Sequence, residues 1–395
     1  VVQVIRMVQQ SLSSGQPDRA LSEVPDRLGQ TLVVARELTP NELAVLHDRG
    51  VAGVITEHGS PYSHTAILAR GMGIPAVMGV RRAQSLITEG EQLVLDGAYG
   101  IVFADPEESI LRHYLQKQSE SDRYRKALQA SRGLASRSLD GVAISLQTNA
   151  ERPEDIRRAV EDGAEGVGLF RSEYLFMQGE PPDEESQFAS YLEALDSLDG
   201  APLTIRTLDI GADKNASMLS FASLRSSPNP ALGVRAVRLC LREVDLFKVQ
   251  LRAILRTSAH GRVHCMIPML TTSREGKAAR SLLDETRHEL EKEGIAVDAK
   301  MQLGGMIEVP AAALALEQIA RHLDFISVGT NDLIQYALAA DRIDEYVAHL
   351  YDPQHPGVIY LLQHIFSTAN RLDLPVSVCG EMAGDRRFTR LLLAL

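Results

Sequence analysis

Arginine residues recur beside short apolar segments in the later part of this 395-residue chain. Arg171 and Arg206 end such segments, and Arg235 and Arg342 lie in loops or helix starts nearby. A guanidinium group binds carboxylate and phosphate through paired hydrogen bonds, so these arginines suit a compact anion that carries both groups. The alternative is that each arginine closes an ion pair with a neighbouring acid on the rim of the fold.

Two acidic residues in the same region are candidate metal ligands. Glu308 and Asp332 each follow an apolar segment. Mg²⁺ binds oxygen atoms, commonly one or two protein carboxylates together with substrate oxygens and water. These two carboxylates therefore predict a Mg²⁺ site beside the bound anion.

Cys379 ends another apolar segment, directly before Gly380 and Glu381. An ordinary thiol is mostly protonated at pH 7, which suits a proton donor to an enolate better than a nucleophile. A lone cysteine is also typical of core packing, and that is our interpretation of Cys240 and Cys265. Three cysteines without CxxC spacing predict neither a disulfide framework nor a zinc site.

A histidine at a predicted helix start is the candidate nucleophile. Ser63 is the expected N-cap, so His64 lies in the first turn, where backbone N–H groups and the helix dipole stabilise a phosphate on the ring. Neutral imidazole, the main form near pH 7, needs no strong neighbouring base. His58 competes for this role but precedes Gly59, away from the helix. The alternative is an imidazole that only caps a turn.

The elements that position His64 form a small β/α pattern over residues 28–105. Thr39 followed by Pro40 marks a helix start. Strands are predicted at 31–35 and 51–56, a helix at 64–72, and a hairpin at 92–97 and 100–105. Residues 1–12 are predicted to be the end of a helix, and 106–135 to be a long, charged connecting helix.

Short apolar strands alternate with helices from about residue 139 onward. Strands are predicted at 142–147, 166–170, 203–207, 263–268, 303–308, 325–329 and 375–379, and helices at 153–162, 183–197, 273–293 and 310–322. This alternation indicates parallel α/β architecture, and seven strands predict a (β/α)8 barrel incomplete at its last unit. A doubly wound open sheet is the rival fold. In both folds the carboxyl ends of the strands meet, so the candidate residues should converge.

Composition excludes several kinds of partner. The formal net charge is −11, which disfavours a nucleic-acid or anionic-membrane surface. No apolar run reaches the ~18–20 residues of a membrane helix. Three widely spaced cysteines agree with a reducing compartment, so we expect a cytoplasmic protein.

A set of seven motifs carries a family resemblance. In chain order they are GSPYSHTAILARGMGIPAVMG, GVGLFRSEYLFM, TIRTLDIGADK, NPALGVRAVR, GGMIEVPAAA, DFISVGTNDLIQYALAADR and PVSVCGEMAGD. Together they resemble enzyme I of the bacterial phosphoenolpyruvate phosphotransferase system, from about residue 28 to the end. Parts of these motif sequences are also similar to the nitrogen-system paralogue or to multi-domain fusion forms.

The resemblance implies a phosphoenolpyruvate-protein phosphotransferase. Such an enzyme moves the phosphoryl group of phosphoenolpyruvate to a histidine, releases pyruvate, and passes the phosphate to a histidine phosphocarrier protein (HPr-like). It uses Mg²⁺ and forms a homodimer through the barrel. The implied domains are a remnant of the helical carrier-binding subdomain with its linker (1–27), a swivelling phosphohistidine domain (28–105), a linker helix (106–138) and a phosphoenolpyruvate-binding barrel (139–395).

The resemblance also assigns roles to single residues. His64 matches the phosphorylated histidine, and Cys379 matches the acid that protonates the enolate. The residues that match substrate contacts are Arg171, Arg206, Arg235, Asn331 and Arg342, and those that match Mg²⁺ ligands are Glu308 and Asp332. One departure is that Ile343 and Asp344 follow Arg342, where the family usually has Gly-Asn or Asn-Asn.

Three other functions remain open on the sequence. A phosphoenolpyruvate synthase or pyruvate phosphate dikinase shares both domains but needs an ATP-grasp domain, for which these residues do not code. A non-catalytic phosphoenolpyruvate sensor would bind without forming phosphohistidine. A barrel lyase using Mg²⁺ and a pyruvate-type substrate would leave residues 28–105 without a role.

Overall fold

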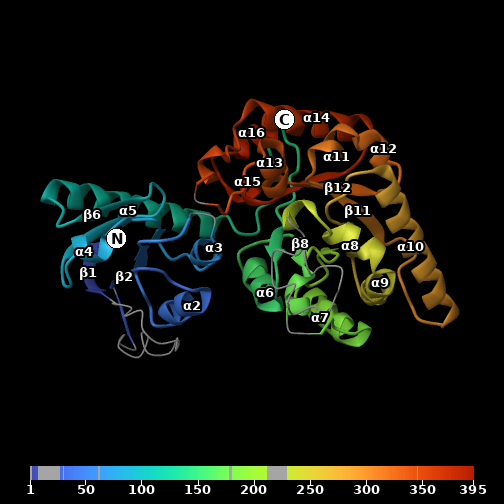
Figure 1. The fold of residues 1–395 in the computed structure, drawn as a ribbon, viewed down its shortest axis with the longest axis horizontal. Helices are drawn as coiled ribbons and strands as arrows, with labels where there is room; N and C mark the ends of the chain where they lie inside the picture. Colours follow the sequence, from blue (N-terminus) through green and yellow to red (C-terminus); the bar gives the residue numbers. More distant parts are fainter. Residues whose placement is uncertain are drawn as a thin grey trace. The chain divides into compact units, whose positions relative to one another are not determined.

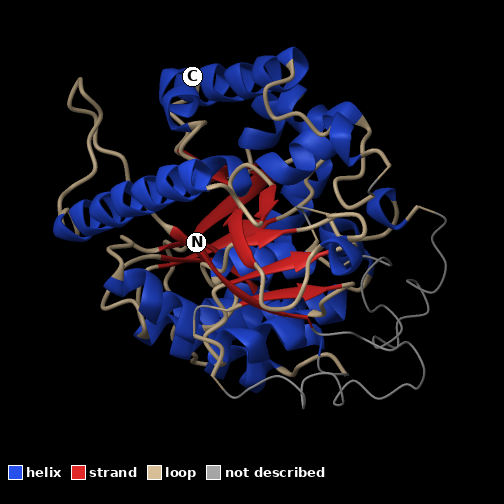
Figure 2. Ribbon diagram, turned by 90° about the vertical axis from the view of Figure 1, so that its left-hand side faces the viewer, coloured by secondary structure: helices blue, strands red, loops and turns tan. Residues whose placement is uncertain are grey.

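The computed structural model describes residues 2–7, 27–29, 31–60, 63–177, 180–210, 229–344 and 346–395. The chain divides into two compact units, the first formed by residues 1–131 with 340–350 and the second by 132–339 with 351–395. Both units combine helices and strands (Figure 1, Figure 2). Within the described ranges, the helices are all too short or too polar to cross a bilayer.

The first unit is built on a six-stranded mixed sheet. Its strands are β1 (Val2–Met7), β2 (Leu32–Ala35), β3 (Gly53–Thr56), β4 (Ala76–Val77), β5 (Gln92–Asp96) and β6 (Ile101–Ala104), and its helices include α2 (Pro40–Asp48), α3 (His64–Gly71) and α4 (Ala83–Leu86). The strand order is β4-β3-β2-β1-β5-β6, with β1 to β4 parallel and the β5–β6 hairpin antiparallel.

Alternation along β2 divides the apolar side chains between the two faces of this sheet. Leu32 and Val34 belong to one buried cluster, and Val33 belongs to another that includes Leu43 of α2 and Ala69 of α3. Because successive side chains of a strand point to opposite faces, one short strand supports both cores. The second cluster holds α2 and α3 against the sheet.

Residues 2–7 form strand β1, so the helix predicted for 1–12 is wrong there. Ile5 lies opposite Leu32 of β2, and Val2 lies opposite Val94 of β5. The β-branched residues of this stretch favour extended backbone, and pairing on both sides satisfies its hydrogen-bonding groups. The rest of 1–26, including most of the predicted subdomain remnant, lies outside the described residues.

The connecting helix predicted over 106–135 is present but shorter, as α5 (Glu108–Ala130). None of its 23 residues is buried, in agreement with its charged, weakly amphipathic sequence. The domain boundaries predicted at 27, 105 and 138 stay predictions.

The second unit contains a seven-stranded parallel sheet. Its strands are β7 (Thr148–Ala150), β8 (Val167–Arg171), β9 (Leu203–Arg206), β10 (Val263–Ile267), β11 (Gln302–Ile307), β12 (Phe325–Gly329) and β13 (Val376–Cys379). They follow one another in chain order across the sheet, and β13 also contacts β8. In a doubly wound sheet the order of the strands would reverse at a switch point, whereas here the order follows the chain. The predicted mixed α/β class with a TIM-type barrel is therefore confirmed.

Helices surround these strands (Figure 1). They are α6 (Pro153–Glu161), α7 (Glu184–Asp196), α8 (Ala236–Arg242), α9 (Val244–Ser258), α10 (Ser273–Lys292), α11 (Pro310–Leu314), α12 (Leu316–Ala320), α13 (Thr330–Leu338), α14 (Pro356–Arg371), α15 (Glu381–Gly384) and α16 (Thr389–Ala394). Inside the barrel, Leu169, Met266, Met306 and Cys379 form a buried cluster.

Two predictions in the second unit need correction. The first strand is Thr148–Ala150 rather than 142–147, because Val142 and Leu146 are more than half exposed and join no core. The predicted helix 310–322 is two short helices that meet at Ala315. The other predicted strands and the remaining predicted helices agree with the structure to within two residues.

Candidate active site

The carboxyl ends of the barrel strands carry most of the predicted site residues. Arg171 and Arg206 end β8 and β9, and the strand register places them opposite each other. Cys379 ends β13 opposite Gly329, and Glu308 directly follows β11. The predicted convergence at this end of the barrel is therefore confirmed for these residues.

Arg206 is held by two acids. Its Nη2 atom donates to Glu173 Oε1 at 2.9 Å, and its Nη1 atom lies 3.0 Å from Asp209 Oδ2. Burial acts to lower the pKa of Arg206, but the carboxylates of Glu173, Asp209 and Glu308 outweigh it and raise that pKa. The guanidinium therefore stays charged in a site where its side chain is only 12% exposed.

Arg235 is the N-cap residue of α8 and reaches the same acids. Its Nη2 atom donates to Asp209 Oδ1 at 2.8 Å and lies 3.5 Å from Asp332 Oδ2. Its Nη1 atom donates to the Tyr336 hydroxyl at 3.2 Å. Asp209 thus bridges Arg206 and Arg235, and Asp332 of α13 is joined to the same network.

Arg171 is the most open of the three arginines. Its Nη1 atom donates to Glu151 Oε1 at 3.1 Å, and both side chains are more than a third exposed. The ion-pair alternative from the sequence is thus confirmed for Arg171, Arg206 and Arg235. The Nε atoms of Arg171 and Arg206 are nevertheless buried without a hydrogen-bond partner in the described part of the chain.

Glu308 is a buried carboxyl group, 3% exposed, whose Oε1 atom accepts from the Met269 N–H at 2.6 Å. Burial raises its pKa to about 8, and the negative charges of Asp332 and Asp209 add to the increase. A Cβ atom on Gly329 would lie 2.7 Å from Glu308 Oε2, so glycine leaves the space that this carboxyl occupies.

The charges of the buried cluster are unbalanced. Among the described residues, its cationic side chains are Arg206 and Arg235, and its acidic side chains are Glu173, Asp209, Glu308 and Asp332. Full ionisation leaves an excess of two negative charges, which a divalent cation would offset. The described residues include no group of three or more His, Cys, Asp or Glu arranged around a metal position. Mg²⁺ needs only one or two carboxylates, so the oxygen donors of Glu308 and Asp332 fit this ion.

Cys379 lies at the same end of the barrel, 6% exposed. The Ser327 hydroxyl donates to Sγ at 3.3 Å, and the thiol donates to the Val328 carbonyl at 3.6 Å. Burial raises the pKa of the thiol, and the charge of Glu308 adds to this effect against the hydrogen bond from Ser327. The thiol therefore remains protonated at neutral pH, as the sequence predicts for a proton donor.

Asn331 fixes the turn that follows Cys379. Its side-chain oxygen accepts from the Glu381 N–H at 2.8 Å. Gly380 has φ +97°, and a Cβ atom there would lie 2.5 Å from Thr330 Oγ1 and 2.9 Å from Asn331 Oδ1. Glycine thus allows the backbone after β13 to approach the first turn of α13.

Arg342 belongs to a different unit from Arg171, Arg206 and Arg235. It lies after α13 in residues 340–350, which are grouped with the first unit. Its predicted role in substrate binding stays a prediction.

His64 begins helix α3, and the predicted N-cap is confirmed. The Ala66 N–H donates to Ser63 Oγ at 3.2 Å, and the Thr65 hydroxyl donates to the Leu38 carbonyl at 2.8 Å. His58 is exposed in the preceding loop, before Gly59 at φ +109°. The first turn of α3 thus offers backbone N–H groups at His64, as the sequence predicts.

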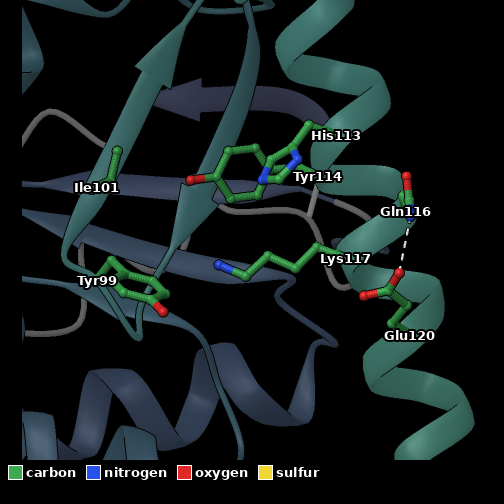
Figure 3. A pocket seen from close by; sticks show the side chains of 7 residues that line it. All are labelled: Tyr99, Ile101, His113, Tyr114, Gln116, Lys117 and Glu120. Atoms are coloured by element: carbon green, nitrogen blue, oxygen red, sulfur yellow. Dashed lines mark hydrogen bonds between the residues drawn. The ribbon is translucent and has the colours of Figure 1, made fainter.

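A pocket in the first unit lies between the β5–β6 hairpin and α5 (Figure 3). Lys117 extends toward the ring of Tyr99, 4.3 Å from its centroid, and its Nζ atom donates to Asp96 Oδ2 at 2.7 Å. None of the predicted site residues lines this pocket.

The sequence assigned no role to Glu173, Asp209 or Tyr336, although each contacts a candidate arginine. The spacing of Asp209, three residues after Arg206, is the feature of the sequence that could have indicated their ion pair. The interpretation of Cys240 and Cys265 as core residues is confirmed, because both are buried.

The fold and the strand-end cluster agree with a comparison to known families. The family described as PEP-utilising enzyme, PEP-binding domain, matches residues 125–395, and the PEP-utilising enzyme mobile domain matches residues 29–100. The chain belongs to the PEP-utilising enzymes.

Individual relatives make the family resemblance more specific, because they share one name. The chain is similar to proteins named phosphoenolpyruvate-protein phosphotransferase from Cupriavidus necator (44% identity over 96% of this chain), Bacillus sp. (40% over 93%) and Staphylococcus aureus (40% over 92%). It spans 65%, 63% and 63% of their lengths. The resemblance inferred from the motifs is confirmed.

Proposed function

We propose that this protein is a phosphoenolpyruvate-protein phosphotransferase. It transfers the phosphoryl group of phosphoenolpyruvate to His64, releases pyruvate, and passes the phosphate to a histidine phosphocarrier protein (HPr-like). The observation that carries the proposal is the pair Arg171 and Arg206, opposite each other at two strand ends, each with a buried Nε donor that lacks a partner among the described residues. The shared name of the relatives supports the same activity.

The arginines bind the substrate in this proposal. Arg171 and Arg206 contact its phosphate or carboxylate through their remaining donors, and Arg235 contributes positive charge beside them. Asn331 and Arg342 are proposed as further substrate contacts. Charge developing on the transferred phosphoryl group is where such sites lower the barrier, so preformed guanidinium positions are the main contribution of the barrel.

Glu308 and Asp332 are the proposed ligands of Mg²⁺. When bound, this ion neutralises phosphoryl oxygens and balances the excess of acids in the cluster. In a chain without the ion, burial and the charges of Asp332 and Asp209 raise the pKa of Glu308 and thus favour its protonated form.

His64 and Cys379 carry the proposed chemistry. A ring nitrogen of His64 attacks phosphorus as the bond between phosphorus and the enolate oxygen breaks. The resulting enolate takes a proton at carbon from the Cys379 thiol, which gives pyruvate and a thiolate that water reprotonates. Burial keeps the thiol protonated until the enolate forms.

Transfer between the two sites needs movement of the phosphohistidine domain. His64 belongs to the first unit, and Arg171, Arg206 and Arg235 belong to the second. One histidine cannot face the substrate and the carrier protein at the same time, so we propose that the domain swivels between them. The protein is further proposed to form a homodimer through the barrel and to act in the cytoplasm.

Labelled phosphoenolpyruvate tests the function directly. The full chain with Mg²⁺ should acquire acid-labile radioactivity, the His64→Ala variant should acquire none, and the control His58→Ala should label like the parent. Label that persists in His64→Ala contradicts the assignment of the nucleophile.

The same assay separates the rival functions. Labelling of His64 from ATP would favour a phosphoenolpyruvate synthase or dikinase. Calorimetric binding of phosphoenolpyruvate without any phosphohistidine would favour a sensor. Pyruvate release that does not depend on His64 would favour a barrel lyase.

A further inference from the structure

We propose that Asp209 is a positioning residue, assisted by Tyr336, that fixes the guanidinium groups of Arg206 and Arg235 relative to each other. The inference rests on the proposed function, because the positioned arginines belong to the same anion site. Asp209 and Tyr336 lie within the motifs, but the motifs do not show their contacts. The proposal adds the requirement that two substrate-binding arginines share one buried carboxylate as their spacer.

The contacts of Asp209 assign one oxygen to each arginine. Oδ2 lies 3.0 Å from Arg206 Nη1, and Oδ1 accepts from Arg235 at 2.8 Å from Nη2 and 3.3 Å from Nε. The carboxylate is only 5% exposed. Because the two oxygens belong to one planar group, the spacing of the two guanidinium groups follows from the position of Asp209.

The backbone at Asp209 is itself anchored, in part through Glu173, which also binds Arg206. The other part of the anchor is Gln250, whose hydrogen bonds within the described part of the chain go to groups other than the arginines. The Asp209 N–H donates to Glu173 Oε1 at 3.0 Å, and the neighbouring Leu208 N–H donates to Gln250 Oε1 at 2.9 Å. Gln250 is 1% exposed and also donates to Ser172 Oγ at 3.0 Å. This buried network joins the chain after β8 to the chain after β9.

Tyr336 completes the support of Arg235. Its hydroxyl accepts from Arg235 Nη1 at 3.2 Å and donates to the Ala231 carbonyl at 2.6 Å. Arg235 is therefore held on one side by a carboxylate and on the other by a hydroxyl with its own backbone partner. A side chain held at both ends loses little freedom when a substrate binds.

An alternative role for Asp209 predicts the opposite effect on binding. If Asp209 only neutralised charge, removing its negative charge would strengthen the attraction of an anionic substrate. If it positions the arginines, removing one of its acceptor oxygens would weaken binding. The sign of the change in affinity therefore distinguishes the two roles.

Calorimetric titration with phosphoenolpyruvate and Mg²⁺ tests the proposal in the full chain carrying His64→Ala, so that the ligand is not consumed. Asp209→Asn removes the charge at constant size, and Asp209→Glu keeps the charge but moves it by one methylene. We expect both variants to raise Kd at least about tenfold, the scale of a misplaced binding group. In a chain carrying Arg235→Ala, Asp209→Asn should have a smaller effect, because one of the groups it positions is gone.

Glu184→Gln is the matched control. Glu184 also bridges two arginines, with Oε2 at 2.6 Å from Arg252 Nε and Oε1 at 2.8 Å from Arg256 Nη1, but it joins α7 to α9 away from the strand ends. It should lower the melting temperature and leave Kd unchanged. Tyr336→Phe is the second site variant and should raise Kd severalfold with little change in melting temperature.

Each outcome decides between the proposals. No binding by the parent would reject the proposed function. Binding by the parent with tighter or unchanged Kd in both Asp209 variants would overturn the positioning role alone. If the Asp209 variants fail to fold, the decision passes to Tyr336→Phe, and an unchanged Kd in that variant overturns the proposal.

Discussion

Arginines at the strand ends can satisfy acidic neighbours and still bind an anion. A guanidinium group has five N–H donors, and the acids around Arg206 use its Nη atoms while Nε stays without a partner among the described residues. Ion pairing and substrate binding, which were alternatives on the sequence, are therefore compatible uses of the same side chain. The acids orient the donors that remain.

Cys379 is a residue whose chemistry depends on its surroundings. Its ordinary pKa of 9.0 is raised by burial and by the charge of Glu308. A raised pKa extends the protonated, donating form to higher pH. The proton-delivery step should therefore decline at a higher pH than it would with an ordinary cysteine thiol.

Cys379→Ala tests this role. We expect pyruvate formation to slow by about 10²-fold or more, the contribution of a positioned general acid, while calorimetry shows little change in phosphoenolpyruvate binding. Cys265→Ala is the control, since Cys265 is equally buried in mid-strand β10. Loss of binding instead of loss of turnover would contradict the proton-donor role.

At the scale of elements, short segments with defined ends position several candidate residues. Strand β13 ends at Cys379, and Gly380 turns the chain at φ +97° toward Thr330 and Asn331. Helix α3 begins at His64 because Ser63 caps it. In both places one residue sets the end of an element and thereby the backbone position of a candidate residue.

Ser63→Ala tests the importance of the helix start. Loss of an N-cap costs about 1 kcal/mol of stability, so the melting temperature should fall. Labelling of His64 by phosphoenolpyruvate should also slow, because the first turn of α3 would fray around the phosphorylated ring.

Thr39→Ala is the matched control for this variant. Thr39 caps α2 of the same unit with a capping box to Glu42, so its loss should cost similar stability. If both variants slow labelling equally, the effect reflects general destabilisation and the special role of the α3 start is wrong.

At the scale of the whole molecule, two units each have their own core. Leu32, Val34 and Leu93 belong to the first, whereas Leu169 and Met266 belong to the second. Helix α5 buries none of its residues in either. A ligand of the barrel should therefore stabilise one unit without stabilising the other.

Scanning calorimetry of the His64→Ala chain tests this independence. Phosphoenolpyruvate with Mg²⁺ at about 100 times Kd should stabilise the second unit by about 2.7 kcal/mol and raise one of two transitions. A single transition that moves as a whole would show that the units unfold together.

Much of this protein could be predicted from local sequence patterns. Apolar strands between helices indicated the parallel barrel, and the order of polar residues after those strands indicated which side chains meet. Helix starts at Thr39 and Ser63 were predictable because capping is decided within four residues. The strand at Val2–Met7 was not predictable, since its partners lie at Leu32 and Val94, far along the chain.

The partners of the arginines were decided only by the tertiary structure. The sequence supplied an excess of polar groups at the strand ends but not their pairing, because Glu173, Asp209 and Tyr336 reach the arginines from three different segments. The raised pKa of Glu308 likewise arises from burial and from carboxylates that are far along the chain but close in space. Residue types and element order are local properties, whereas charge pairing and burial depend on how the barrel brings its strand ends together.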